Sequence, residues 1–310
     1  MKIVCIGGGH GLSNVLSAIK HLPVEITAIV ATTDNGGSTG KIRQAFNNIA
    51  WGDIRRCLCA LTDQQHPMHQ ILCHRFNQVN EFSGHSVGNL LLLSCEQLKM
   101  TPQQSIDSFK AMLDIKHEIR PMSETPTDLI AITKDSKQII GECQIDKLDE
   151  LPISLSLTHS VKTSHENIKD ILNADLILIG PGSNLTSIMP VLLVPQIQQA
   201  LKHTQANKIL ISNLSDEKSV ASSVPYSKLL DWMYSQLGFQ AFDHVLTDTK
   251  VNLATKNNQI KFDFSDKVQA LYAKQSVRPS QTGQHNIKQL TNAIETILLG
   301  LIQQKSVRTA

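Results

Sequence analysis

The segment at positions 2–19 constrains the fold more than any other part of the chain. It opens with a short apolar run rich in β-branched side chains, which predicts a buried strand. Four glycines follow within positions 7–11, and the remaining residues have the apolar spacing of a helix. A strand, a glycine turn and a helix in this order form a phosphate cradle. The glycines let the backbone approach an anion, and the first amides of the helix point toward it.

The glycines do not reproduce the dinucleotide fingerprint G-x-G-x-x-G, because Leu12 occupies the position of its third glycine. A tight turn that binds nothing would also use glycine, but a single turn does not need four of them. We therefore expect this segment to bind the diphosphate of a nucleotide. The residues expected to contribute are Gly8, Gly9, His10, Gly11 and Leu12.

Two further polar loops follow predicted buried strands. The strand at 25–31 leads into a loop that contains Asp34, Asn35, Gly37 and Ser38. The strand at 174–179 leads into a loop that contains Gly180, Gly182 and Ser183. Because the carboxyl ends of neighbouring parallel strands lie at one edge of a sheet, these loops are expected beside the first glycine turn.

Two predicted helix starts carry charged and polar side chains toward the same edge. Asp53 is expected as the cap of a helix that also presents Arg55, and His85 precedes a helix that carries Asn89 in its first turn. Arg55 suits bidentate pairing with a phosphate, and Asp34 suits a ribose hydroxyl or Mg²⁺. The alternatives left open are a surface ion pair for Arg55, a turn-shaping role for Asp34 and a helix cap for His85.

Composition excludes several classes of function. The net charge of +2 is too small to indicate nucleic acid or a membrane surface, and 4% aromatic residues do not favour a base-stacking platform. The longest apolar runs are far shorter than a membrane span, and no N-terminal signal is visible. We therefore expect a cytoplasmic protein that binds a small-molecule nucleotide, with no nucleic acid partner and no membrane insertion.

A cluster of cysteines and histidines between positions 57 and 74 invites comparison with zinc sites. Its spacing matches no closed four-ligand site, and C-x-C on a helix directs the two thiols to different faces. Buried thiols and exposed histidines are the favoured interpretation. The residues considered are Cys57, Cys59, His66, His69, Cys73 and His74.

The order of elements predicts an α/β fold: a three-layer, Rossmann-like, mostly parallel sheet with a small side β-region and a C-terminal helix. The side region is expected from the two-residue periodicity of residues 119–142, and the helix from the amphipathic segment at 286–301, capped by Asn286. No repeat or linker is visible, so residues 1–310 are expected to form a single nucleotide-binding domain.

The same motifs resemble the CofD/YvcK family, and the match is closer to its YvcK/YbhK-type branch, the gluconeogenesis factors. The similarity spans the chain to about position 194. It rests on the segments beginning at Gly7, Asp34, Gly52, Gly84, Gly141 and Gly180. One departure is Asn35, which stands where the family usually has a second acid. Asp34 is then the remaining candidate for a metal ligand.

The resemblance implies a homodimer that binds UDP-sugars and acts in carbon metabolism, cell-wall supply and cell shape. No reaction is firmly attached to that branch, so enzymatic activity stays open. The alternative is a 2-phospho-L-lactate transferase type of enzyme. It would move a phospho-group from a nucleoside-diphosphate donor to an acceptor hydroxyl, with Asp34 and Mg²⁺ stabilising charge and His85 or Asp53 as base. An NAD-dependent dehydrogenase is disfavoured by the incomplete glycine fingerprint.

Overall fold

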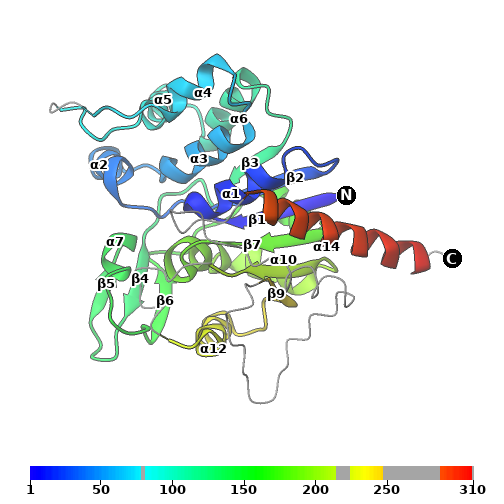
Figure 1. The fold of residues 1–310 in the computed structure, drawn as a ribbon. Helices are drawn as coiled ribbons and strands as arrows, with labels where there is room; N and C mark the ends of the chain where they lie inside the picture. The colour runs from blue at the N-terminus through cyan, green and yellow to red at the C-terminus, as the bar shows by residue number, and fades with distance from the viewer. Residues whose placement is uncertain (78–80, 214–223, 247–286, 309–310) are drawn as a thin grey trace.

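A six-stranded parallel sheet forms the centre of the molecule (Figure 1). The structure is a computed structural model that describes residues 1–77, 81–213, 224–246 and 287–308. Every neighbouring pair of strands in this sheet is parallel, as expected for a doubly wound fold. In spatial order the strands are β3 (Glu118–Pro121), β2 (Glu25–Val30), β1 (Lys2–Gly7), β7 (Leu176–Ile179), β8 (Asn207–Ile211) and β9 (His244–Leu246).

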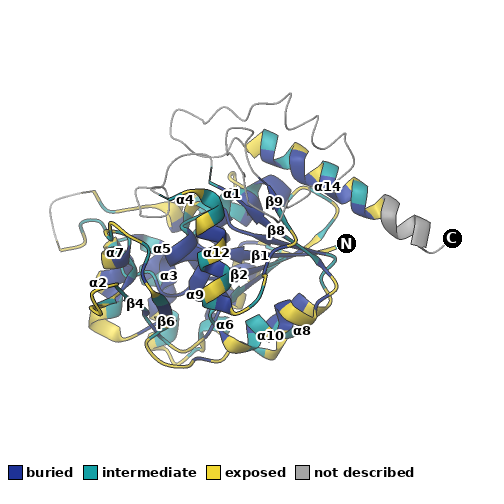
Figure 2. Ribbon diagram, turned by 90° about the horizontal axis from the view of Figure 1, so that it is seen from below, coloured by how far each residue is buried: buried dark blue, intermediate teal, exposed yellow. Residues whose placement is uncertain are grey.

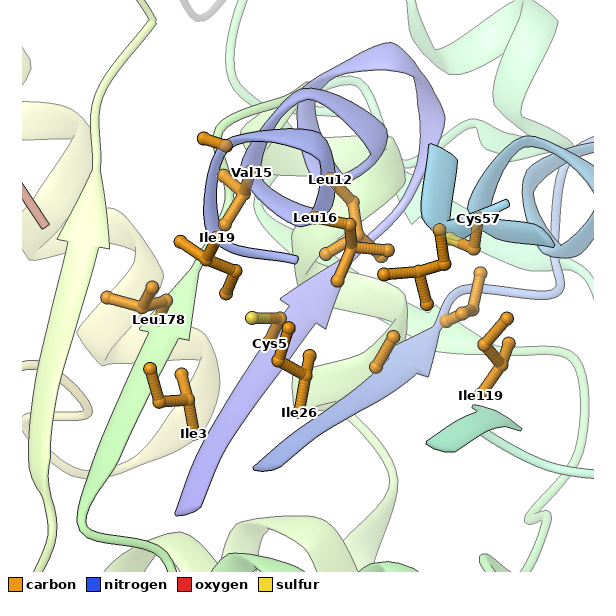
Figure 3. Packing of buried hydrophobic residues seen from close by; sticks show 14 of the residues in the cluster. Ile3, Cys5, Leu12, Val15, Leu16, Ile19, Ile26, Cys57, Ile119 and Leu178 are labelled. Atoms are coloured by element: carbon orange, nitrogen blue, oxygen red, sulfur yellow. The ribbon is translucent and has the colours of Figure 1, made fainter. Parts of the chain in front are cut away.

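Alternate side chains of the central strands face two separate hydrophobic cores. In β1, Ile3 and Cys5 belong to one core, and Val4 and Ile6 belong to the other. Figure 3 shows the first core, in which α1 lies over the strands. Helices α1 (Gly9–Ile19), α3 (Trp51–Leu61), α5 (Val87–Gln97), α6 (Pro102–Met112) and α14 (Ile287–Arg308) cover this face. Helices α8 (His165–Leu172), α9 (Met189–Leu192), α10 (Pro195–His203) and α12 (Tyr226–Leu237) cover the other. The three-layer α/β prediction is confirmed.

A small antiparallel sheet extends the second core. It consists of β5 (Gln138–Ile140), β4 (Leu129–Ile132) and β6 (Ser154–Leu157), with β4 in the middle. The sequence predicted such a region but included Ile119 in it, and that assignment is wrong. Ile119 lies in β3, which pairs with β2 at the edge of the main sheet. A two-residue periodicity is common to both kinds of strand, so it did not distinguish them.

The C-terminal helix α14 packs along α1 and projects beyond the body of the molecule (Figures 1 and 2). Leu290 and Ile294 are buried in the first core, and the Thr291 hydroxyl donates to the Ala18 carbonyl at 2.9 Å. The predicted cap, Asn286, lies outside the described residues. Within the parts of the chain that the structure describes, no helix has the length and apolarity needed to cross a bilayer.

Helices begin inside the predicted polar loops. Helix α2 (Gly37–Phe46) starts within the loop after β2, and a π-helix, η1 (Asn184–Ile188), starts within the loop after β7. Two other short helices, α4 (Pro67–Cys73) and α7 (Glu142–Ile145), complete the described elements. The starts of α1, α2 and η1 therefore follow the carboxyl ends of three adjacent strands. That a single domain spans residues 1–310 stays a prediction.

Candidate functional site

The glycine loops predicted to meet do lie together at one edge of the sheet. A Cβ atom on Gly11 would collide with the carbonyl oxygen of Pro181, so the loops after β1 and β7 are in backbone contact. A Cβ on Gly52 would lie 3.2 Å from Asp34 Oδ2, which joins the start of α3 to the loop after β2. The Cys143 amide donates to Asn35 Oδ1 at 3.0 Å and adds α7 to the same region. The predicted convergence is confirmed as geometry.

The Asp53 carboxylate already occupies part of the predicted phosphate cradle. Its Oδ2 accepts a 2.6 Å hydrogen bond from the Gly9 amide at the start of α1, and its Oδ1 forms an ion pair with Arg56. Asp53 was predicted as the cap of its helix, and that is wrong, because α3 begins at Trp51. A carboxylate at a helix N-terminus is favourable. Here the helix that benefits is α1, which is distant in sequence.

Four acidic side chains gather at this edge. Burial is the first cause that raises the pKa of Asp34, and the nearby Asp53 charge is the second. Burial and the charges of Asp34, Asp53 and Asp146 raise the pKa of Glu142 well above its usual range. Burial also raises the pKa of Asp146, which accepts a 3.0 Å bond from the Thr186 hydroxyl. Among the described residues, no group of three His, Cys, Asp or Glu side chains has a metal-binding arrangement.

The raised pKa of Glu142 predicts a pH-dependent stability. Folded Glu142 holds its proton more tightly than unfolded Glu142, whose pKa is about 4.3. Its contribution to stability is therefore complete below that pH and is lost as the pH rises through the folded-state pKa. Glu142→Gln should flatten this fall in the free energy of unfolding, measured with urea between about pH 5 and 8. The exposed Glu150→Gln is the control and should leave the profile unchanged. An unaltered slope in Glu142→Gln would contradict the assignment.

A chain of polar contacts links four of the predicted residues. Ser38 Oγ lies 3.2 Å from His85 Nδ1 and accepts a 3.3 Å bond from Asn89 Nδ2. Asn89 Oδ1 in turn accepts a 3.2 Å bond from Arg55 Nε. Burial, followed by the charges of Lys41 and Arg75, lowers the pKa of His85. These contacts bring the start of α2, the middle of α3 and the start of α5 into one network, in which the Arg55 guanidinium is buried.

A large cleft of about 1540 Å³ opens beside this network. At one end it is lined by His10, Ser13, Arg55 and Arg56, and from there it follows α1 to α14. Burial is the main cause that lowers the pKa of His10, and the charges of Arg56, Arg55 and Arg75 add to it. This end of the cleft therefore carries the field of several guanidinium groups, which favours an anion.

The remaining predicted residues lie in the loops after β1, β2 and β7 or at the helix starts that follow them. The Leu12 side chain is fully buried, and its amide donates to the Gly8 carbonyl at 3.3 Å. Gly180 precedes a cis proline, and Asn213 holds both the amide and the carbonyl of Gly182 at 2.9 Å. Ser183 caps η1 by accepting from the Thr186 amide. Gly37 begins α2 with a φ of 48°.

Sequence reasoning missed several residues that shape this region. Arg56 and Ser13 line the cleft, yet neither was among the predicted site residues. Glu142 lies in the segment beginning at Gly141, which supported the family resemblance, but no role was predicted for it. Nothing in the sequence around Asp146 indicated a place in the site. Arg43 holds the loop around Asp34 by donating to the Thr33 and Asp34 carbonyls. The signal for Arg56 was its position directly after Arg55 on a helix that starts at the sheet edge.

Comparisons with known proteins agree with the motifs. The family model described as "2-phospho-L-lactate transferase CofD" matches residues 3–281. A Pasteurella multocida protein named "Putative gluconeogenesis factor" is 41% identical over 260 residues, which cover 84% of this chain and 84% of that protein. The gluconeogenesis factor of Bacillus subtilis is 32% identical over 279 residues, covering 90% of this chain and 84% of the relative.

The solved structures give the same result for the fold. The crystal structure of a UPF0052 family member from Bacillus halodurans has a TM-score of 0.78 and 29% sequence identity. The superposition covers 94% of this chain and 99% of that chain, so the two proteins have the same architecture over nearly their whole length.

Proposed function

The chain belongs to the CofD family, and we propose that it is a cytoplasmic nucleotide-sugar-binding protein of the gluconeogenesis-factor type. In this proposal the ligand is a UDP-sugar, and its binding adjusts carbon metabolism and cell-wall supply, and through them cell shape. The homodimer expected from the family is part of the proposal. Relatives at 41% and 32% identity carry the gluconeogenesis-factor name rather than that of a transferase, which favours this function over group transfer.

One observation carries the proposal: the glycine turn after β1 lies next to the electropositive end of the cleft, because His10 lines the cleft together with Arg55 and Arg56. Asp53 already accepts from the Gly9 amide, so the incoming diphosphate is proposed to lie beside that amide, against His10, Arg55 and Arg56. Guanidinium groups bind phosphate with paired hydrogen bonds, and the Ser13 hydroxyl on the same wall adds a neutral donor. From there the cleft follows α1 to α14, which leaves room for one of the two groups that a nucleotide sugar attaches to its diphosphate.

Mg²⁺ is an optional part of this proposal. The carboxylate oxygens of Asp34 and of the acidic side chains around it suit Mg²⁺. Proteins commonly hold this ion through one or two carboxylates together with ligand phosphates. The surrounding acids are Asp53, Glu142 and Asp146. When bound, the ion would offset phosphate charge. We propose Asp34 as the residue that holds it.

Calorimetry of the purified protein tests the proposal. UDP-N-acetylglucosamine, UDP-glucose, GDP compounds and NAD are titrated separately, with Mg²⁺ and with EDTA. At least one UDP-sugar is expected to bind. Arg55→Lys, which keeps the charge and loses the planar fork, should weaken that binding about tenfold, or about 1.4 kcal/mol. Thermal unfolding of the variant is the control for its fold. No binding of any UDP-sugar at millimolar concentration would overturn the proposal.

Ligand binding is expected to draw a proton onto His10. The pKa of His10 is lowered in the free protein by burial and by nearby guanidinium charges. A bound diphosphate offsets those charges, so the pKa rises and affinity increases as the pH falls, about tenfold per unit of pKa shift. Calorimetry in two buffers of different ionisation enthalpy measures the proton uptake. His10→Gln should remove it, whereas His21→Gln, at another part of the cleft wall, should not. Equal uptake by both variants would exclude His10.

A further inference from the structure

Two cysteines on the cleft wall lie unusually close together. Cys59 on α3 and Cys73 at the end of α4 have their Sγ atoms 2.7 Å apart. A disulfide bond measures about 2.05 Å, so a movement of less than about 1 Å would bring the two sulfurs to bonding distance. Both residues are free thiols. The two sulfurs therefore already lie within a short movement of each other's bonding distance.

The surroundings of the two thiols differ. Cys73 is exposed, with His69 Nε2 at 3.8 Å from its sulfur, and Cys59 is buried, with Arg55 Nη1 at 3.9 Å from its sulfur. The Cys59 thiol beside it lowers the pKa of Cys73 to about 7, and the Arg55 charge acts in the same direction. Cys73 is thus the accessible and more readily ionised partner. A thiol that attacks a disulfide needs both of these properties.

Two other interpretations of the pair, a metal site and a structural role in the core, do not explain the positions of both cysteines. A structural metal would need further ligands, and the described residues contain no group of three side chains suited to a metal. A purely structural role as core thiols fits Cys57, which is fully buried, but not Cys73. Cys59 and Cys73 both line the cleft, so a small reagent that enters the cleft can reach them.

We propose that Cys59 and Cys73 form a dithiol site that is reversibly oxidised by small organic disulfides of the glutathione class. The Cys73 thiolate attacks one sulfur of the reagent, which forms a mixed disulfide and expels one thiolate. Cys59 then loses its proton and attacks the Cys73 sulfur, which forms the internal disulfide and expels the second thiolate. The protein loses two electrons and two protons, and the reagent becomes two thiols. Excess thiol reverses both steps.

The proposal is tested on the full-length protein with glutathione disulfide as the probe. After oxidation, the remaining thiols are alkylated and the protein is digested with trypsin, which cleaves after Arg56 and Arg75 and so places both cysteines in peptide 57–75. The wild-type peptide is expected to carry one alkyl group, on Cys57, and to lack two hydrogens. Dithiothreitol before alkylation should restore three alkyl groups.

Variants separate the roles of the two cysteines. Cys59→Ser should accumulate the mixed disulfide on Cys73, because the resolving thiol is gone, and Cys73→Ser should form neither product. Cys57→Ala is the matched control and should still form the internal disulfide. An unoxidised wild-type peptide, a stable mixed disulfide in the wild type, or a bridge that requires Cys57 would each overturn the proposal.

A labelling experiment on the unmodified chain gives a second readout that no folding defect can disturb. With limiting iodoacetamide, Cys73 is expected to react before Cys95 and Cys143, since burial raises the pKa of both of these partly exposed thiols. If Cys73 reacts no faster than those two, it is not the attacking thiol.

Discussion

Gly11→Ala will unfold or strongly destabilise the protein, although it adds a single methyl group. The new Cβ would collide with the Pro181 carbonyl and lie 3.0 Å from the Gly182 amide nitrogen, so it meets backbone rather than a movable side chain. Overpacking of side chains commonly costs about 1–3 kcal/mol, and a backbone obstacle places this variant at or above the upper end of that range. Urea denaturation measures the loss, and ligand calorimetry should show that binding is lost with it.

Gly300→Ala is the matched control for this experiment. Gly300 lies inside α14, and among the described residues no atom beyond the adjacent backbone of its own helix is within 4 Å of the position that its Cβ would take. Alanine is favoured over glycine in a helix interior by about 1 kcal/mol, so this variant should be equally or more stable than the wild type. If Gly11→Ala were as stable as Gly300→Ala, the loops after β1 and β7 would not be in the described contact.

The sheet edge was predictable because its elements carry local signals. The apolar runs of β1, β2 and β7 identified buried parallel strands, and the rule that such strands end at one edge brought the glycine loops together.

The fine structure of the site depends on contacts that leave no local pattern. Asp53 resembled a helix cap in the sequence, but it bonds to an amide 44 residues earlier in the chain. Cys59 and Cys73 belong to different helices, and the spacing of residues within a helix says nothing about how two helices dock. Asp146 gains its environment from η1, through Thr186, only when the loop after β7 folds against α7.

Arg43 is the clearest example of such a contact, and its replacement is expected to have the second large effect. The side chain of Arg43 on α2 is only 9% exposed and pairs with Asp128 at 2.7 Å. It also donates to four backbone carbonyls: two in the β2–α2 loop, one just after α2 and one just before β4. These belong to Thr33, Asp34, Asn48 and Thr127. One guanidinium therefore fixes the loop that carries Asp34 against the side sheet.

Arg43→Met keeps an unbranched side chain and removes every one of these donors. Loss of one partner of a buried ion pair costs about 3–5 kcal/mol, and the partial exposure of Asp128 places the expected loss near the lower limit. Lys41→Met, an exposed position on the same helix, controls for the charge and should change stability by less than about 0.5 kcal/mol. Urea denaturation measures both, and limited proteolysis should show earlier cleavage in the loop around Asp34 in Arg43→Met. If the two variants were equally stable, water would replace the Arg43 contacts at no cost, and Arg43 would not be the residue that fixes the loop around Asp34.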